Sequence, residues 1–333
     1  MSKMHSLYKY RLRVGNLLKV LLSLVFGGLI LYWMYRKFDF RNIGDFMLYK
    51  MDWMWMFLSF PFGILAQVFR GWRWKQTLEP VGETCRTRTL VNSIYLSYAV
   101  SLIIPRIGEF ARCGVLSSKD GVSFPKALGT VFMERIIDML LLLIITGVVL
   151  FLQFNIFGTF FDKTGVSIDS IFYRFTETGW IVTGICSVTI LVVILFLLKK
   201  FSVHHRISDA LHSIVEGLVS LKYVKNKPLF FFFTLAIWVS YFLHFYLTFY
   251  CFDFTKDLGL MCALVCFIVG SIAVIVPTPN GAGPWHFAVK TMLVLYGVVD
   301  TDALYFVLIV HTVQTLLVIL LGIYGAIYMS LKK

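Results

Sequence analysis

Long apolar stretches alternate with short polar ones along the whole chain. A helix that crosses the hydrocarbon core of a bilayer needs about 20 predominantly apolar residues. The stretches of suitable length lie at residues 17–35, 53–72, 125–152, 179–198, 228–251 and 303–329. The pattern therefore predicts an all-α integral membrane protein with about six spanning helices in one multi-pass domain, residues 1–333.

Two further apolar runs, at 90–104 and 258–276, end at a polar break that contains proline and glycine. Shorter amphipathic pieces follow the breaks, at about 106–118 and 284–298. Proline removes a backbone donor and glycine relaxes the dihedral angles, so each break favours the end of one helix and the start of another. We expect two broken hairpins in addition to the spanning helices.

Lysine and arginine are distributed unevenly between the polar linkers. The 199–227 linker carries six of them and the 153–178 loop only two. Cytoplasmic loops are enriched in these residues, so the first linker is predicted to be cytoplasmic and the second external. The 73–88 loop is basic as well and is placed inside, and we expect both chain termini to be cytoplasmic.

This orientation predicts how the two broken hairpins enter the membrane. Because 125–152 supplies the single crossing needed after the 73–88 loop, residues 90–123 enter and leave on the cytoplasmic side. By the same count, residues 258–298 enter from outside. The halves 53–152 and 228–329 would then form an inverted repeat, an arrangement that in transporters places the substrate site at the broken helices.

The remaining segments are the N-terminal helix and the central linker. We expect 17–35 to be a retained first helix, because no small-residue cleavage site follows it and Arg36 and Lys37 close the apolar run. In the 199–227 linker, apolar residues at helical spacing predict an amphipathic helix on the cytoplasmic face. A plain connecting helix packed on the bundle fits the same pattern.

Composition supports a membrane protein. The chain is 59% hydrophobic and 15% charged, against roughly 25% charged residues in soluble domains. The net charge is +13. No polar module is large enough to carry a nucleic-acid site, so the basic residues fit cytoplasmic loops better, and we expect no nucleic-acid partner. The six cysteines form no CxxC pair and are interpreted as small apolar fillers.

The break at 105–112 is rich in charge. A helix that begins near Gly108 would direct free N–H groups toward an anion, and the guanidinium groups of Arg106 and Arg112 suit phosphate oxygens. Glu109 would pair with one arginine or with a cationic part of a ligand. The alternative is a closed salt-bridge network that only holds the hairpin together.

A second charged group lies inside the apolar stretch 125–152. Glu134 and Asp138 share one helix face, and Arg135 is placed to bridge to Asp138 three residues later. Ionisable groups at bilayer depth are costly and usually face a polar interior. We expect these three residues to form a polar network that positions the neighbouring hairpin and borders a substrate site.

The second break, at 277–286, is rich in glycine and proline and carries no acidic residue. Asn280, Gly281 and Gly283 are predicted to form a non-helical turn that lines the opposite wall of the site. His286 is a candidate proton carrier, but a hydrogen-bonded structural histidine is the favoured interpretation. No catalytic residues, metal ligands or cofactor-binding motif are predicted.

Four motifs occur in order along the chain. They are RGWRW at 70–74, PRIGEFAR at 105–112, ERIID at 134–138 and PTPNGAG at 277–283. Together they resemble the lysylphosphatidylglycerol synthase transmembrane region, also called the flippase-like domain. The resemblance implies a module of the bacterial inner membrane that moves aminoacylated phospholipid between leaflets, while a separate soluble domain makes that lipid.

The sequence departs from the family pattern in two respects. It ends at Lys333 without room for a synthase domain, so we expect a stand-alone member and do not expect aminoacyl transfer. Asn280 and His286 stand where the family often has Gly and Glu, which suggests that a different lipid is moved.

The functional expectation is a flippase-like protein that translocates a phospholipid or a polyprenyl-phosphate-linked headgroup, in which Arg106 and Arg112 contact phosphate. A separate synthase or glycosyltransferase is a possible partner. The alternatives are a membrane-embedded enzyme, or an enzyme partner, acting on lipid-linked sugars or phospholipids, and a non-transporting scaffold of envelope synthesis. The oligomeric state does not follow from the sequence.

Overall fold

The structure is a computed structural model that describes residues 24–36, 38–154 and 213–331. Within these ranges the secondary structure is helical, with no strand. After a first helix, Leu24–Tyr35, the elements are η1 (Phe40–Asn42), α2 (Ile43–Tyr49), α3 (Trp53–Leu78), η2 (Glu79–Val81), α4 (Thr87–Ile103), α5 (Gly108–Asp120), α6 (Phe124–Leu152), η4 (Ser220–Tyr223), α11 (Lys227–Tyr246), η5 (Leu247–Cys251), α12 (Asp253–Lys256), α13 (Gly259–Ala273), η6 (Pro279–Gly281), α14 (Pro284–Leu295) and α15 (Asp300–Leu331).

Three helical segments among the described residues are long and apolar enough to cross a membrane. They are Phe124–Leu152, Lys227–Cys251 and Asp300–Leu331. The fold class is therefore confirmed, but the number of six spans stays a prediction, since 17–35 is described only in part and 179–198 lies outside the described residues. The 199–227 linker is likewise described only from residue 213, where a short helix precedes η4.

Helix α3 corrects the predicted end of the 53–72 stretch. It continues to Leu78, so Arg73 lies inside the helix and not in the cytoplasmic loop where the hydropathy pattern placed it. Arginine lowers the apolar score of a sequence window, but the side chain of Arg73 is fully buried against acidic partners. Paired charges of this kind are compatible with a helix at membrane depth.

The first hairpin consists of α4, a turn at residues 104–107, and α5. The two helices pack closely because Gly108 has no side chain: a Cβ atom there would lie 2.0 Å from the backbone oxygen of Ser97. Helix α4 ends just before Pro105, since the residue preceding a proline disfavours helical dihedral angles.

The second hairpin consists of α13, a turn at residues 274–283, and α14. Its helices also meet at a glycine, because a Cβ atom on Gly270 would lie 2.8 Å from Nε1 of Trp285. Two turn residues, Gly281 and Gly283, have φ angles of 72° and 93°. These values lie in the region that favours glycine.

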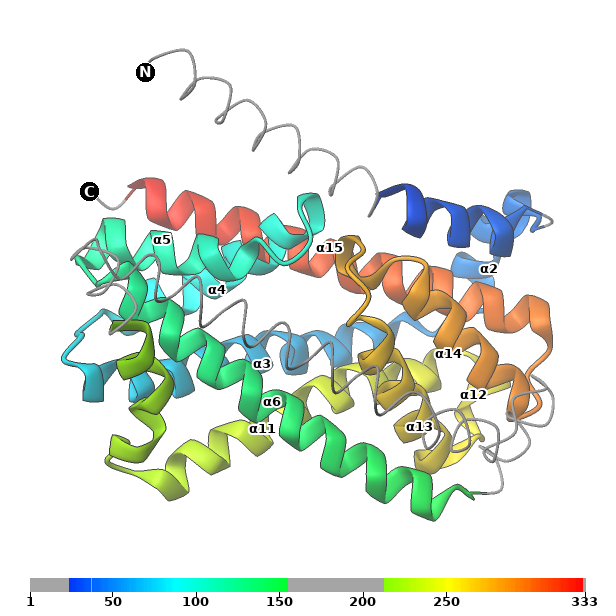
Figure 1. Ribbon diagram of the computed structural model, residues 1–333. Helices are drawn as coiled ribbons and strands as arrows, with labels where there is room; N and C mark the ends of the chain where they lie inside the picture. Colours follow the sequence, from blue (N-terminus) through cyan, green and yellow to red (C-terminus); the bar gives the residue numbers. More distant parts are fainter. Residues whose placement is uncertain (1–23, 37, 155–212, 332–333) are drawn as a thin grey trace, which may run out of the picture.

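The two hairpins enter the molecule from opposite ends, and their turns face each other near its middle (Figure 1). Corresponding helices of the two halves make corresponding contacts, which we call reciprocal. Helix α3 packs on α11, α4 of the first hairpin packs on α15, and α13 of the second hairpin packs on α6. These reciprocal contacts are those of the predicted inverted repeat, whereas its boundaries, 53–152 and 228–329, stay a prediction.

Buried apolar side chains form separate cores beside the two hairpins. One core surrounds the second hairpin, with Phe245, Phe249 and Phe306 among its members, and another surrounds Trp74 beside the first hairpin. By contrast, large apolar residues along α6, such as Leu143 and Phe151, face outward. Outward-facing apolar side chains are expected on a helix that contacts lipid.

The cysteines agree with their interpretation as fillers. All five that the structure describes are free thiols, and four of them are buried. Cys85 lies between α3 and α4, where burial raises the pKa of its thiol to about 12. Such a thiol stays protonated near neutral pH and is a poor nucleophile or metal ligand.

Candidate functional site

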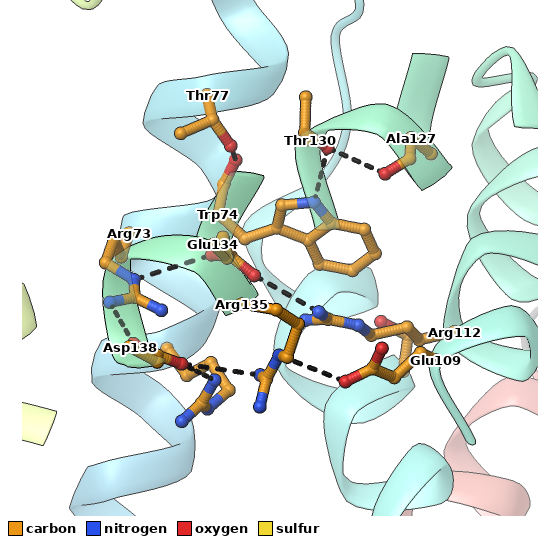
Figure 2. Close-up of polar contacts among 12 residues, drawn as sticks. Arg73, Trp74, Thr77, Glu109, Arg112, Ala127, Thr130, Glu134, Arg135 and Asp138 are labelled. Atoms are coloured by element: carbon orange, nitrogen blue, oxygen red, sulfur yellow. Dashed lines mark hydrogen bonds and ion pairs between the residues drawn. The ribbon is translucent and has the colours of Figure 1, made fainter. Parts of the chain in front are cut away.

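Seven charged side chains from α3, α5 and α6 meet in one network, which we call the ion cluster (Figure 2). Its members are Arg70, Arg73, Glu109, Arg112, Glu134, Arg135 and Asp138. Five of the side chains are at most 8% exposed. Buried charges are tolerated only when they are paired and hydrogen-bonded, and the contacts below provide this pairing.

Asp138 is the centre of one half of the cluster. Its two carboxylate oxygens accept hydrogen bonds from Nη1 of Arg70 at 2.9 Å and from Nη1 of Arg73 at 2.7 Å. Nη2 of Arg135 lies 3.6 Å away, which confirms the predicted contact between Arg135 and Asp138. One carboxylate of α6 therefore anchors two arginines of α3.

Glu134 is the centre of the other half. It accepts a hydrogen bond from Nη2 of Arg112 at 3.1 Å and lies 3.5 Å from Nε of Arg73. The guanidinium group of Arg112 also stacks 4.4 Å from the centroid of the Trp74 ring. The Trp74 indole donates to Thr130 at 2.9 Å. Arg112 is thus enclosed in the conformation described, an arrangement that suits a supporting residue.

Glu109 and Arg135 form the accessible edge of the cluster. Oε1 of Glu109 lies 3.0 Å from Nε of Arg135, and the two side chains are 30% and 37% exposed. Glu109 therefore pairs with Arg135 of α6, whereas Arg112 of its own helix pairs with Glu134. The predicted network links α5 to α6 through these two crossed ion pairs.

The ion cluster carries an excess of positive charge. Four arginines face three carboxylates, so one positive charge has no acidic counterpart within the cluster. Several buried guanidinium nitrogens have no hydrogen-bond partner, among them Nε of Arg70 and Nη1 of Arg112. Guanidinium groups are donors only, so the cluster is suited to an additional anionic acceptor.

Arg106 lies outside the cluster, in the turn of the first hairpin. Its φ angle is 64°, in the left-handed region that non-glycine residues rarely adopt. The side chain is exposed, and Nη2 donates a hydrogen bond to the backbone oxygen of Ile275 in the second hairpin. Arg106 therefore connects the two facing turns.

A cavity of about 190 Å³ lies between α3, α4, α11, α15 and the turn of the second hairpin; we call it the central cavity. Three of its lining residues, Gln67, Tyr98 and Tyr241, connect the cavity with Arg70 of the ion cluster through a series of contacts. Gln67 donates to the hydroxyl of Tyr241 at 3.1 Å, and the hydroxyl groups of Tyr98 and Tyr241 lie 2.9 Å apart. The guanidinium group of Arg70 lies 5.8 Å from the Tyr241 ring centroid.

Of the second-hairpin residues predicted at the site, Asn280 lines the central cavity. Its amide donates to Thr315 at 2.7 Å, and its backbone oxygen accepts from His311 at 3.0 Å. Gly283 lies instead against the first helix, where a Cβ atom would be 2.8 Å from the oxygen of Gly27. His286 is 3% exposed and packs 4.4 Å from the His311 ring, behind the cavity lining.

Other site residues were not identified from the sequence. Arg70 and Arg73 were noted only as parts of a motif, although their three-residue spacing on a helix places them on one face. Gln67, Tyr98 and Tyr241 come from three different helices and carry no local signal. Only the packing of α3, α4 and α11 brings them together.

The fold and the ion cluster define a multi-pass helical membrane protein with a polar, charged interior. The family model of the lysylphosphatidylglycerol synthase TM region matches residues 18–322. The chain therefore belongs to this family of lipid-modifying and flippase-like membrane proteins. Neither a curated protein nor a solved structure matches the chain.

Proposed function

We propose that this protein binds the phosphate-bearing headgroup of a membrane lipid and moves it between the two leaflets of the bacterial inner membrane. The excess positive charge of the ion cluster is the observation that carries the proposal, because a phosphate would supply the missing acidic partner. Burial at membrane depth makes such a charge-assisted contact strong.

The accessible arginines are assigned to the phosphate. Arg135 stands at the exposed edge of the cluster, and Arg106 stands in the turn that precedes α5. Arg112 is enclosed between Glu134 and Trp74, so its role in this proposal is to hold α5 against α6. The turn of the second hairpin, with Asn280, forms the opposite wall.

The arrangement of the hairpins supports movement between leaflets. They enter from opposite ends, and the hydrogen bond from Arg106 to Ile275 joins their turns (Figure 1). A headgroup phosphate that replaces the carbonyl of Ile275 as the acceptor would release one hairpin from the other. Inverted-repeat transporters expose a central site alternately to the two sides by shifting one element against another.

The proposal is tested by a leaflet-resolved transport assay in proteoliposomes, with fluorescent phosphatidylglycerol and a membrane-impermeant quencher. A charge-assisted hydrogen bond contributes about 1.5–3 kcal/mol, so Arg106→Ala should slow transfer by roughly 10-fold to 100-fold. Arg88→Ala is the matched control, since Arg88 is exposed at the start of α4. Wild-type protein that transfers neither phosphatidylglycerol nor a labelled polyprenyl-phosphate-linked hexose faster than empty liposomes would refute the proposal.

A further inference from the structure

We propose that the central cavity selects phospholipid headgroups that carry neutral hydroxyl groups beyond the phosphate, and that it discriminates against cationic headgroups. This inference rests on the proposed function and specifies its substrate class. The cavity is much larger than the ~15 Å³ that a single water molecule needs, and it adjoins the ion cluster through Arg70 and Tyr241. A phosphate at the cluster would therefore direct its substituent into the cavity.

Gln67 gives the most specific evidence for a hydrogen-bond donor in the cavity. The residue is 6% exposed, and its amide nitrogen is occupied by the hydroxyl of Tyr241. Its Oε1 atom is buried without a hydrogen-bond partner. An unsatisfied buried acceptor is costly, and a ligand hydroxyl that donates to Oε1 would remove that cost.

Two histidines of the lining add further acceptors. Nδ1 of His244 bonds the backbone oxygen of Ser59 at 2.9 Å, and Nε2 of His311 bonds that of Asn280 at 3.0 Å. A carbonyl oxygen only accepts, so these ring nitrogens donate their protons. In each neutral imidazole the second nitrogen is consequently an acceptor. The residues that line the cavity thus carry several acceptor lone pairs, which suit a ligand rich in O–H donors.

An ammonium group is also a donor, but the charges around the cavity disfavour it. No aspartate or glutamate occurs among the described residues that line the cavity. The charged group packed against the Tyr241 ring is Arg70, which belongs to a cluster with an excess positive charge. A buried ammonium without an acidic partner is strongly disfavoured, whereas a hydroxyl carries no such penalty.

Aromatic side chains complete the lining. Trp285, Tyr98 and Tyr241 each provide an apolar ring face together with a polar edge. Such rings pack against the C–H faces of a polyol while its hydroxyl groups reach the acceptors. Glycerol, inositol and hexose share this chemistry, so the inference covers a polyol-bearing phospholipid and a polyprenyl-phosphate-linked sugar.

The test compares headgroups in the same proteoliposomes. Transfer rates are measured for labelled phosphatidylglycerol, lysyl-phosphatidylglycerol, phosphatidic acid and a polyprenyl-phosphate-linked hexose. We expect a hydroxyl-bearing lipid to move about threefold to tenfold faster than phosphatidic acid, the effect of one hydrogen bond on a rate. The lysyl lipid should be slower than phosphatidylglycerol. The faster of the phosphatidylglycerol and hexose arms identifies the source of the headgroup.

Gln67→Leu should lower the rates of the hydroxyl-bearing lipids more than that of phosphatidic acid, so that the ratio of the two rates falls toward one. Gln76→Leu, the same substitution on the same helix but outside the cavity lining, should preserve the selectivity. Wild-type rates for both phosphatidylglycerol and the hexose lipid that do not exceed the rate for phosphatidic acid, or a faster lysyl lipid, would overturn the inference and leave the proposed function intact. Transfer of none of the four lipids would refute both.

Discussion

The two hairpins share a backbone plan, but different side chains hold their turns in place. In each, a glycine lets the paired helices approach closely, Gly108 in the first hairpin and Gly270 in the second. The first hairpin is held by ion pairs from Glu109 and Arg112 to α6. The turn of the second is held by neutral hydrogen bonds between Asn280 and α15. The ion pair of Lys290 with Asp300, which also joins this hairpin to α15, lies away from the turn and is more exposed.

The difference suits the two parts of a lipid headgroup, its phosphate and the polar group attached to the phosphate. An anionic phosphate requires positive charge, which the first hairpin and its neighbours supply. A neutral polar substituent requires hydrogen-bond acceptors without charge, which the second hairpin and the central cavity supply. The comparison also predicts that the two halves differ in how strongly their stability depends on charge.

The largest effect on stability is expected at Asp138, the buried carboxylate at the centre of the ion pairs beside the first hairpin. Asp138→Ala leaves Arg70 and Arg73 without their shared carboxylate. Removal of one partner from a buried ion pair costs about 3–5 kcal/mol, so the purified protein should melt at a much lower temperature. The control is Asp253→Ala, which removes an exposed carboxylate that pairs with Lys256. Similar melting temperatures for the two variants would show that the cluster does not stabilise the fold.

A smaller loss of stability is expected from a substitution at the close contact between α4 and α5 of the first hairpin. Gly108→Ala places a Cβ atom 2.0 Å from the Ser97 oxygen, so the two helices must separate. Overpacking of this kind costs typically 1–3 kcal/mol. Gly114→Ala on the same helix meets no atom within 4 Å and should be neutral or slightly stabilising. Thermal melting in detergent measures both variants, and an unchanged Gly108→Ala protein would contradict the hairpin geometry.

The smallest effect is expected in the second hairpin. Thr315→Val removes the acceptor of the Asn280 amide, a neutral hydrogen bond worth about 0.5–1.5 kcal/mol. Thr291→Val serves as the control, because that hydroxyl bonds only within its own helix. A loss of stability for Thr315→Val as large as that for Asp138→Ala would show that the two hairpins do not differ in how strongly charge stabilises them.

Much of the fold could be predicted from local patterns. The proline and glycine breaks located both turns, and the lysine and arginine bias predicted that the hairpins enter from opposite sides. The spacing of Arg135 and Asp138 predicted their contact, because both lie on one helix. These features depend on residues close together in the chain.

The composition of the site could be predicted only in part. The crossed pairs, Glu109 with Arg135 and Arg112 with Glu134, depend on how α5 sits on α6. The hydropathy pattern predicted that Arg73 lies in a loop. In the structure it lies inside α3 and is buried, because it pairs with Glu134 and Asp138 of α6. The central cavity exists only where α3, α4, α11, α15 and the second turn meet, so no sequence window contains it.

The proposed mechanism requires that a phosphate-bearing lipid occupies the space beside the accessible arginines, Arg106 and Arg135. Native mass spectrometry of the purified protein measures the bound lipid directly. We expect the wild type and Arg88→Ala to retain a phosphate-bearing lipid and the double variant Arg106→Ala/Arg135→Gln to lose most of it. Equal retention by all three proteins would show that these arginines do not hold the lipid.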